Sequence, residues 1–225
     1  MWCVPKLDAE YIRCMEDVLD TLAKPANERE PVVCLDERPV QLHGCARLGI
    51  PMRPGRIARR DYEYVRLGTA NIFCITEPKV GRHYTHATPD RKAPRFAKAL
   101  KHIAKRHRKA KTIHMIVDNL NTHCEKSLVE TFGPEEGRKL WNRFTVHYTP
   151  KHGSWLNPAE IEVGLWSREC LGSDRIATLC ELTGRTRAWN ASANRLRRKI
   201  EWRFTTQKAR RVFRYRRRTT PGSEH

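Results

Sequence analysis

Apolar residues recur at helical spacing near the start of the chain. Residues 8–23 therefore predict an amphipathic helix, which Pro25 would end. The apolar positions of this helix are three or four residues apart: Leu7, Tyr11, Met15, Val18, Leu19 and Leu22. Further along, β-branched and apolar runs predict strands at residues 32–35, 113–117 and 144–148. Two more strands, at 62–66 and 70–76, would be joined by a hairpin at residues 67–69.

Helical patterns alternate with these strands. We predict helices at 91–109, at 127–144 with a break at Gly133-Pro134, at 157–170, and within 174–200. Pro158 would take the first position of the third helix, which is favoured because that residue needs no hydrogen-bond donor. Residues 44–60 lack a period and predict a basic loop. The order indicates one α/β domain with a mixed sheet flanked by helices.

Three carboxylates fall at the ends or starts of these elements. Asp36 follows the strand at 32–35, Asp118 follows the strand at 113–117, and Glu160 lies just inside the helix at 157–170. If the two strands are neighbours, the three groups converge and can hold two hard cations, as metal-dependent phosphoryl transfer requires. Alternatively, each residue alone is an ordinary turn or cap residue.

The charge balance favours a polyanionic partner. The chain has 44 Lys and Arg against 25 Asp and Glu, a formal net charge of +19. Residues 91–111 contain ten basic side chains and no acid, and residues 195–218 contain twelve and one acid. Such runs are either solvated faces or contacts to the phosphate backbone of nucleic acid. The candidate nucleic-acid contacts are Arg91, Lys92, Lys98, Lys101, Lys105, Arg106, Arg197 and Arg198.

Eight cysteines are present without a Cys-x-x-Cys pair, so zinc-finger spacing is absent and a reducing compartment is expected. No segment approaches the roughly 20 apolar residues of a membrane helix. We therefore expect a soluble, cytoplasmic protein with no membrane association.

Three blocks of sequence resemble those of one enzyme family. They are Asp36-Glu37, residues 118–123 (DNLNTH) and residues 147–160 (HYTPKHGSWLNPAE). Together they are similar to the catalytic blocks of bacterial insertion-sequence transposases of the mariner-like (IS six-thirty) family, over residues from about Trp2 to about Ala209. The resemblance implies a ribonuclease-H-like fold. It also implies a DDE triad that binds two Mg²⁺ ions, for which Mn²⁺ can substitute.

Position by position, the resemblance implies that Asp36, Asp118 and Glu160 are the catalytic and metal-binding acids. Glu162 competes with Glu160, but the two lie about 200° apart on a helix, so only one can face the metals. We prefer Glu160 because it directly follows the Asn-Pro-Ala step of the family pattern. Glu37 is expected to face away or support a neighbour, and supporting roles are expected for Asn119, His123 and Asn157.

The resemblance also implies an organisation and an activity. Residues 1–29 would be a linker helix, 30–200 the catalytic domain and 201–225 a basic tail, with the N-terminal DNA-recognition region missing. A homodimer in the bacterial nucleoid would cleave DNA at element ends and transfer the strand to target DNA. The alternatives are a metal-dependent nuclease on the same fold and an inactive remnant that only binds DNA.

Overall fold

The computed structural model describes residues 7–59 and 61–215. At its centre is a six-stranded sheet of order β3-β2-β1-β5-β6, with β4 also paired to β2. The strands are β1 (Val32–Cys45), β2 (Tyr64–Glu77), β3 (Arg82–His83), β4 (His86–Thr88), β5 (Ile113–Val117) and β6 (Phe144–Tyr148). Strands β1, β5 and β6 run parallel, whereas β2 is antiparallel to β1. The predicted mixed sheet is confirmed.

Strand β1 changes partners along its length. Its first residues, Val32 to Cys34, pair in parallel with β5, Cys34 pairs with both neighbours, and from Leu35 onward β1 pairs only with β2. The prediction that this strand ends at residue 35 is wrong, because the hydrogen bonds to β2 continue as far as Cys45. Asp36 therefore lies inside a long strand, just past the point where β1 separates from β5.

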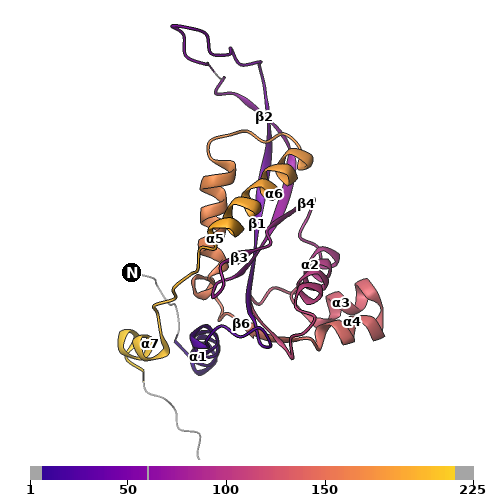
Figure 1. Cartoon of the computed structure of the whole chain (residues 1–225), viewed down its shortest axis with the longest axis vertical. Helices are drawn as coiled ribbons and strands as arrows, with labels where there is room; N and C mark the ends of the chain where they lie inside the picture. Colours follow the sequence, from indigo (N-terminus) through magenta and orange to yellow (C-terminus); the bar gives the residue numbers. More distant parts are fainter. Residues whose placement is uncertain (1–6, 60, 216–225) are drawn as a thin grey trace, which may run out of the picture.

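Helices cover both faces of the sheet (Figure 1). They are α1 (Ala9–Ala23), α2 (Ala93–Arg106), α3 (Glu125–Phe132), α4 (Pro134–Trp141), α5 (Ala159–Trp166), α6 (Leu179–Leu196) and α7 (Thr206–Phe213). Successive β1 side chains face opposite layers, as strand geometry requires. Val33 and Leu35 join a core with α2 and α3, whereas Cys34 packs with α1 and Val40 packs with α6.

The predicted hairpin at residues 67–69 is wrong. Residues 64–77 form one strand, in which Gly68 adopts a φ of 109° opposite a bulge between Gln41 and His43 of β1. A glycine tolerates this φ because it has no Cβ, so the chain passes through without turning. The reversal lies instead within residues 46–63, which include the predicted basic loop and carry two isolated bridges, Ile50–Arg59 and Arg53–Arg56.

Residues 46–63 form an arm that extends beyond the helical layers at the top of Figure 1. Its base is held by Arg175, whose guanidinium donates to the carbonyl oxygens of Asp61, Tyr62 and Glu63 at 2.6–2.8 Å.

The remaining predicted elements are confirmed with small shifts. The helix break is at Gly133, which lies between α3 and α4. Helix α5 begins at Ala159, with Pro158 as its N-cap, and continues as a π-helical turn over Ser167–Leu171. Among the described residues, no helix has the length and apolar character needed to span a membrane. Part of the predicted basic tail, residues 216–225, lies outside the described residues.

Candidate active site

Asp36 marks one corner of the site. Its Oδ1 accepts a hydrogen bond of 2.7 Å from the backbone N–H of Glu37. The pKa of Asp36 is raised to about 7, mainly because the carboxyl is buried, and the negative charges of Glu160 and Asp118 raise it further. The three acids of the predicted triad are thus close enough to interact electrostatically.

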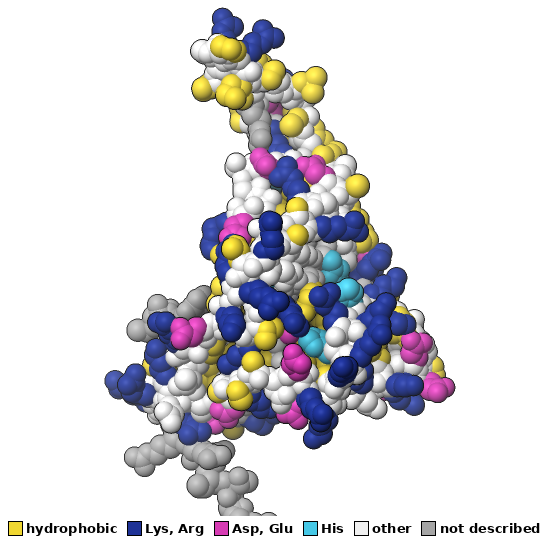
Figure 2. Space-filling model, in the orientation of Figure 1, with side chains coloured by type: hydrophobic (Ala, Val, Ile, Leu, Met, Phe, Trp, Pro, Cys, Tyr) yellow, Lys and Arg dark blue, Asp and Glu magenta, His cyan; other side chains and the backbone are white. Residues whose placement is uncertain are grey.

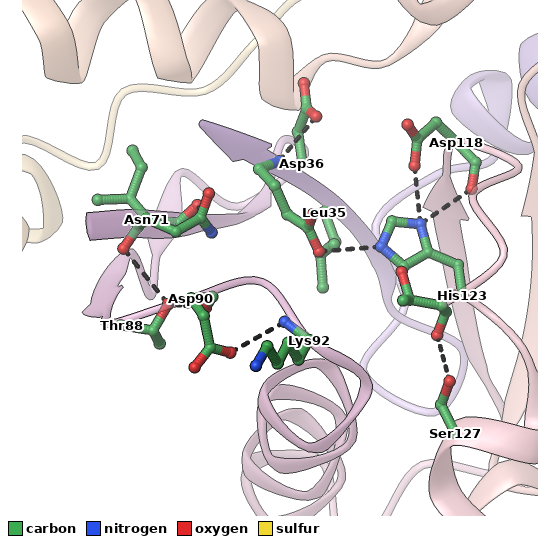
Figure 3. A network of polar contacts seen from close by, with 12 residues as sticks. Leu35, Asp36, Asn71, Thr88, Asp90, Lys92, Asp118, His123 and Ser127 are labelled. Atoms are coloured by element: carbon green, nitrogen blue, oxygen red, sulfur yellow. Dashed lines mark hydrogen bonds and ion pairs between the residues drawn. The ribbon is translucent and has the colours of Figure 1, made fainter. Parts of the chain in front are cut away.

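Asp118 follows β5 and is held by a histidine. His123 Nδ1 lies 2.7 Å from Asp118 Oδ1 and 3.0 Å from the Asp118 carbonyl oxygen (Figure 3). On the other side of the ring, His123 Nε2 lies 3.0 Å from Glu37 Oε1. Burial disfavours the charged ring, but the bonds to Asp118 and Glu37 outweigh it and raise the pKa of His123 to about 9. An imidazolium between two carboxylates therefore orients Asp118.

Glu37 is the residue for which sequence reasoning gave no definite role. Its side chain is only 2% exposed, because Glu37 points to the α2 face of β1, opposite to Asp36. There it supports His123, whose ring also packs 4.6 Å from the Phe96 ring of α2. The period-2 alternation of a strand carried this information: adjacent acids at 36 and 37 must face opposite layers. Tyr148 adds a 2.7 Å bond from its hydroxyl to the His123 carbonyl oxygen.

Asn157 connects the third acid to the first. Its Nδ2 donates to the Leu35 carbonyl oxygen at 2.7 Å, and its Oδ1 accepts from the Ala159 N–H at 3.1 Å. The amide therefore fixes the start of α5 against the residue of β1 that precedes Asp36. One residue into the helix, Glu160 is exposed and near enough to raise the pKa of Asp36.

Glu162 points the other way. Its side chain is 2% exposed, and its Oε2 lies 3.0 Å from Nδ1 of His83, which is equally buried. The helical rotation between Glu160 and Glu162 thus places one acid at the surface beside Asp36 and the other in the protein interior. Asn119, predicted as a supporting residue, is exposed next to Asp118.

The basic residues predicted to bind nucleic acid are separated by the fold. Lys101 pairs with Glu136 of α4 at 2.7 Å, and Arg198 pairs with Glu169 at 2.7 Å. Lys105 lines a cavity of about 640 Å³ at the C-terminal end of α2, away from the three acids. Lys98 and Arg106 line a second groove, between α2 and α6. Arg91 and Lys92 are exposed just before α2, and Arg197 ends α6 in a left-handed conformation.

The donor atoms of the site suit a divalent metal ion. All three acids offer hard carboxylate oxygens, the ligands that Mg²⁺ and Mn²⁺ prefer. Burial and the charges of Glu160 and Asp118 both disfavour the Asp36 carboxylate, and a cation would offset both effects. Within residues 7–59 and 61–215, no three His, Cys, Asp or Glu side chains are yet gathered tightly enough to enclose an ion. The acids fit a divalent metal ion in kind and charge.

Comparison with known proteins defines the family. A sequence profile described as "DDE superfamily endonuclease" matches residues 31–183, which is more than half of the chain. The chain belongs to the DDE superfamily endonucleases. The matched segment of this DDE endonuclease contains Asp36, Asp118 and Glu160, as well as the residues that support them. No curated protein sequence matches the chain.

Solved structures of Mos1 transposase share the fold of this DDE endonuclease. One is a Mos1 paired-end complex with the left transposon end (16% identity, TM-score 0.54), and another is the Mos1 mariner paired-end complex with Mn (14%, 0.57). A third is the Mos1 strand transfer complex (15%, 0.53). Each match covers 87% of this chain but only 59–60% of the Mos1 chain. The ribonuclease-H-like fold is thereby confirmed.

Proposed function

We propose that this DDE endonuclease is the catalytic domain of a DNA transposase of the bacterial insertion-sequence, mariner-like type. It would cleave a DNA strand and join the freed 3′-hydroxyl to target DNA. The observation that carries the proposal is the closeness of Asp36 to Glu160 and Asp118, whose negative charges add to the effect of burial and raise the pKa of Asp36 to about 7. Three acids, from β1, the end of β5 and the start of α5, bring negative charge together, and divalent cations would neutralise this charge.

In this proposal, Asp36, Asp118 and Glu160 hold two divalent ions. When bound, the ions supply activation of water or of a 3′-hydroxyl and stabilise charge on the leaving oxygen. Because Asp36 is partly protonated near neutral pH, metal binding would release its proton. His123 and Glu37 hold the Asp118 carboxylate in one orientation. Asn157 holds α5, and with it Glu160, against β1.

DNA is the proposed substrate. The net charge of +19 supports binding to a polyanion, because neutralising phosphates releases counterions. The Mos1 structures of the same fold are complexes described with a transposon end and with strand transfer. Both observations favour DNA over an acidic protein or a small molecule.

A homodimer is the proposed working form. The arm at residues 46–63 exposes apolar side chains that a monomer would leave in water. Their exposed fractions range from 59% to 96%: Leu48, Ile50, Met52, Ile57 and Tyr62. A second copy that covers the arm would remove this surface from solvent, and two copies would bring two DNA ends together.

Metal-dependent nicking tests the catalytic proposal. The purified chain is incubated with supercoiled plasmid in Mn²⁺, beside Asp36→Asn and Asp118→Asn, and relaxed circles are counted on a gel. We expect the parent to nick and both variants to lose at least about a hundredfold in rate, since each removes a metal-binding charge. A folded parent that binds DNA but never nicks would indicate a DNA-binding remnant.

A second assay separates a transposase from a nuclease on the same fold. A labelled duplex with a pre-cleaved 3′-hydroxyl end is mixed with unlabelled target plasmid and Mn²⁺. Transfer of the label to the plasmid supports strand joining. Nicking without any joined product would favour the nuclease.

A further inference from the structure

A groove separates α2 from α6 along the outer edge of the sheet. It has a volume of about 530 Å³. Its floor is the β3–β4 segment, and its walls are one face of each helix. The lining side chains beyond the floor are Lys98, His102, Arg106, Arg187, Asn190 and Asn194. In Figure 2, Lys and Arg side chains surround histidines over the region of α2 and β4.

The floor of the groove cannot accept an added β-strand. Asn194 accepts from the N–H of His83 and donates to its carbonyl oxygen, both at 2.9 Å. One turn earlier on α6, Asn190 makes the same two bonds to Thr85. These two amides occupy the backbone groups that an edge strand would otherwise offer to a peptide. A ligand of this groove must therefore be recognised by its walls.

The side chains of the walls are cationic, and acidic groups of the protein do not neutralise all of them. No acidic side chain lines the groove, and among the described residues neither Lys98 nor Arg187 has an acidic partner. By contrast, Arg185, two residues from Arg187, is paired with Asp174 at 2.8 Å and with Glu181 at 3.1 Å. Arg106 lies over the ring of Tyr84, at 3.9 Å from its centroid.

Two of the three lining histidines, His86 and His102, add evidence for a positive field. Burial lowers the pKa of His102, and the nearby charges of Arg106 and Lys105 lower it further. Burial likewise lowers the pKa of His86 on the floor. Both rings are therefore neutral near pH 7 and can pack against a ligand or donate one hydrogen bond without adding charge.

The spacing of the wall residues suits a chain of phosphates. Lys98, His102 and Arg106 recur at every fourth residue of α2, so they cover about 12 Å along the helix axis. Arg187 faces them from α6. Helix α2 starts just after Asp90–Lys92, which follows β4, a strand paired with β2 beside β1. A DNA strand that left the catalytic acids and ran along α2 would pass Lys92 first and then reach Lys98.

We propose that the groove between α2 and α6 binds the sugar–phosphate backbone of DNA on its path away from the catalytic acids. This inference rests on the proposed function in DNA cleavage and adds a location for the DNA. Lys98, Arg106 and Arg187 contact phosphates, and the site reads no sequence because backbone contacts position DNA without specifying it.

The salt dependence of DNA binding tests the groove. Binding of a fluorescent duplex is measured by anisotropy in EDTA, so that cleavage does not contribute, at several salt concentrations. The groove variant is Lys98→Gln with Arg187→Gln. The matched control is Lys126→Gln with Arg185→Gln, which loses the same charge from α3 and α6 at residues that have acidic partners.

We expect the groove variant to bind on the order of tenfold more weakly at low salt, and the slope of log affinity against log salt to fall by nearly 2, about 0.9 for each lost phosphate contact. The control should keep the parent slope. Equal weakening of both variants, or none in either, would overturn the proposal.

Lysine acylation of the unmutated protein gives a second measurement that needs no variant to fold. DNA should protect Lys98 and leave Lys126 reactive, and equal protection of the two lysines would overturn the proposed DNA contact in the groove.

The two proposals can fail separately. A parent that nicks plasmid while the groove variant binds like the control refutes the groove alone. A parent that binds DNA through Lys98 and Arg187 but never nicks refutes only the catalytic proposal.

Discussion

At the scale of residues, two adjacent acids have opposite environments. Asp36 faces the layer that contains α5, where Glu160 and Asp118 interact with it. Glu37 faces the layer that contains α2, where it supports His123. A shift of one residue in the register of β1 would exchange the two. The parallel pairing of β1 with β5 therefore determines which acid faces Glu160 and Asp118 and which one faces His123.

The raised pKa of Asp36 predicts a pH-dependent stability. Between its unfolded pKa of 3.8 and its folded pKa of about 7, the folded protein holds a proton that the unfolded chain has released. Stability of the metal-free protein should therefore fall as pH rises through this range, by about 4 kcal/mol at most for this group. Asn cannot ionise, so Asp36→Asn should raise the melting temperature at pH 8 and have little effect at pH 4. Thermal unfolding in EDTA at both pH values measures this.

The matched control for that experiment is Glu135→Gln, which removes an exposed acid of α4. It should follow the parent at both pH values. A variant at Asp36 that is less stable than the parent at pH 8 would contradict the prediction.

Glu37→Gln tests the chain of contacts behind Asp118. The variant keeps a hydrogen-bonding group but loses the charge that helps hold His123 protonated. Partners of this kind typically change metal affinity by about 10- to 100-fold. We expect Mn²⁺ affinity, measured by electron paramagnetic resonance of free Mn²⁺, to fall at least about tenfold. Unchanged affinity in a folded variant would show that Glu37 serves only stability.

At the scale of elements, the predicted helices and short strands agree with the structure because each has a local pattern. The break between α3 and α4, for example, follows from Gly133-Pro134. The wrong predictions concern β1 and β2, because the length of each strand depends on its pairing with the other. Neither strand shows a regular alternation: β1 begins with four buried residues, and β2 has six exposed residues next to the arm followed by eight buried ones.

Two glycines in helices predict opposite responses to alanine. A Cβ at Gly137 of α4 would lie 2.6 Å from the backbone of Val129 in α3, which cannot move away without separating the helices. Gly137→Ala should therefore destabilise the protein by about 1–3 kcal/mol. At Gly184 of α6 a Cβ meets no atom within 4 Å, so Gly184→Ala should stabilise by up to about 1 kcal/mol. Urea unfolding of the two variants measures both signs, and a shared sign would contradict this account.

At the scale of the whole molecule, the exposed apolar arm and the net positive charge indicate two kinds of binding partner. The arm and the adjoining start of β2 carry most of the large apolar side chains that the described residues expose. The face of the core seen in Figure 2, by contrast, is mainly charged and polar. Assembly is therefore expected through the arm and DNA binding through the core.

Replacing the apolar side chains of the arm should change the oligomeric state. We expect light scattering to report a dimer for the parent and a monomer for the triple variant Leu48→Ser, Met52→Ser and Ile57→Ser, because burial of these side chains would stabilise the dimer. The control is Leu196→Ser with Val212→Ser, which removes comparably exposed side chains outside the arm. The same mass for the parent and the triple variant would refute an interface on the arm.

The local elements, the basic charge and the three acids can be read from the sequence, because periodicity, composition and short motifs belong to contiguous residues. Other features depend on pairing between distant segments and appear only in the folded chain. The tertiary structure placed Glu37 behind His123, directed Glu162 toward His83, extended β1 along β2, and formed a groove from α2 and α6. These features follow from strand register and from the angle of each helix on the sheet. Long-range contacts fix both, and no single segment of the chain encodes either one.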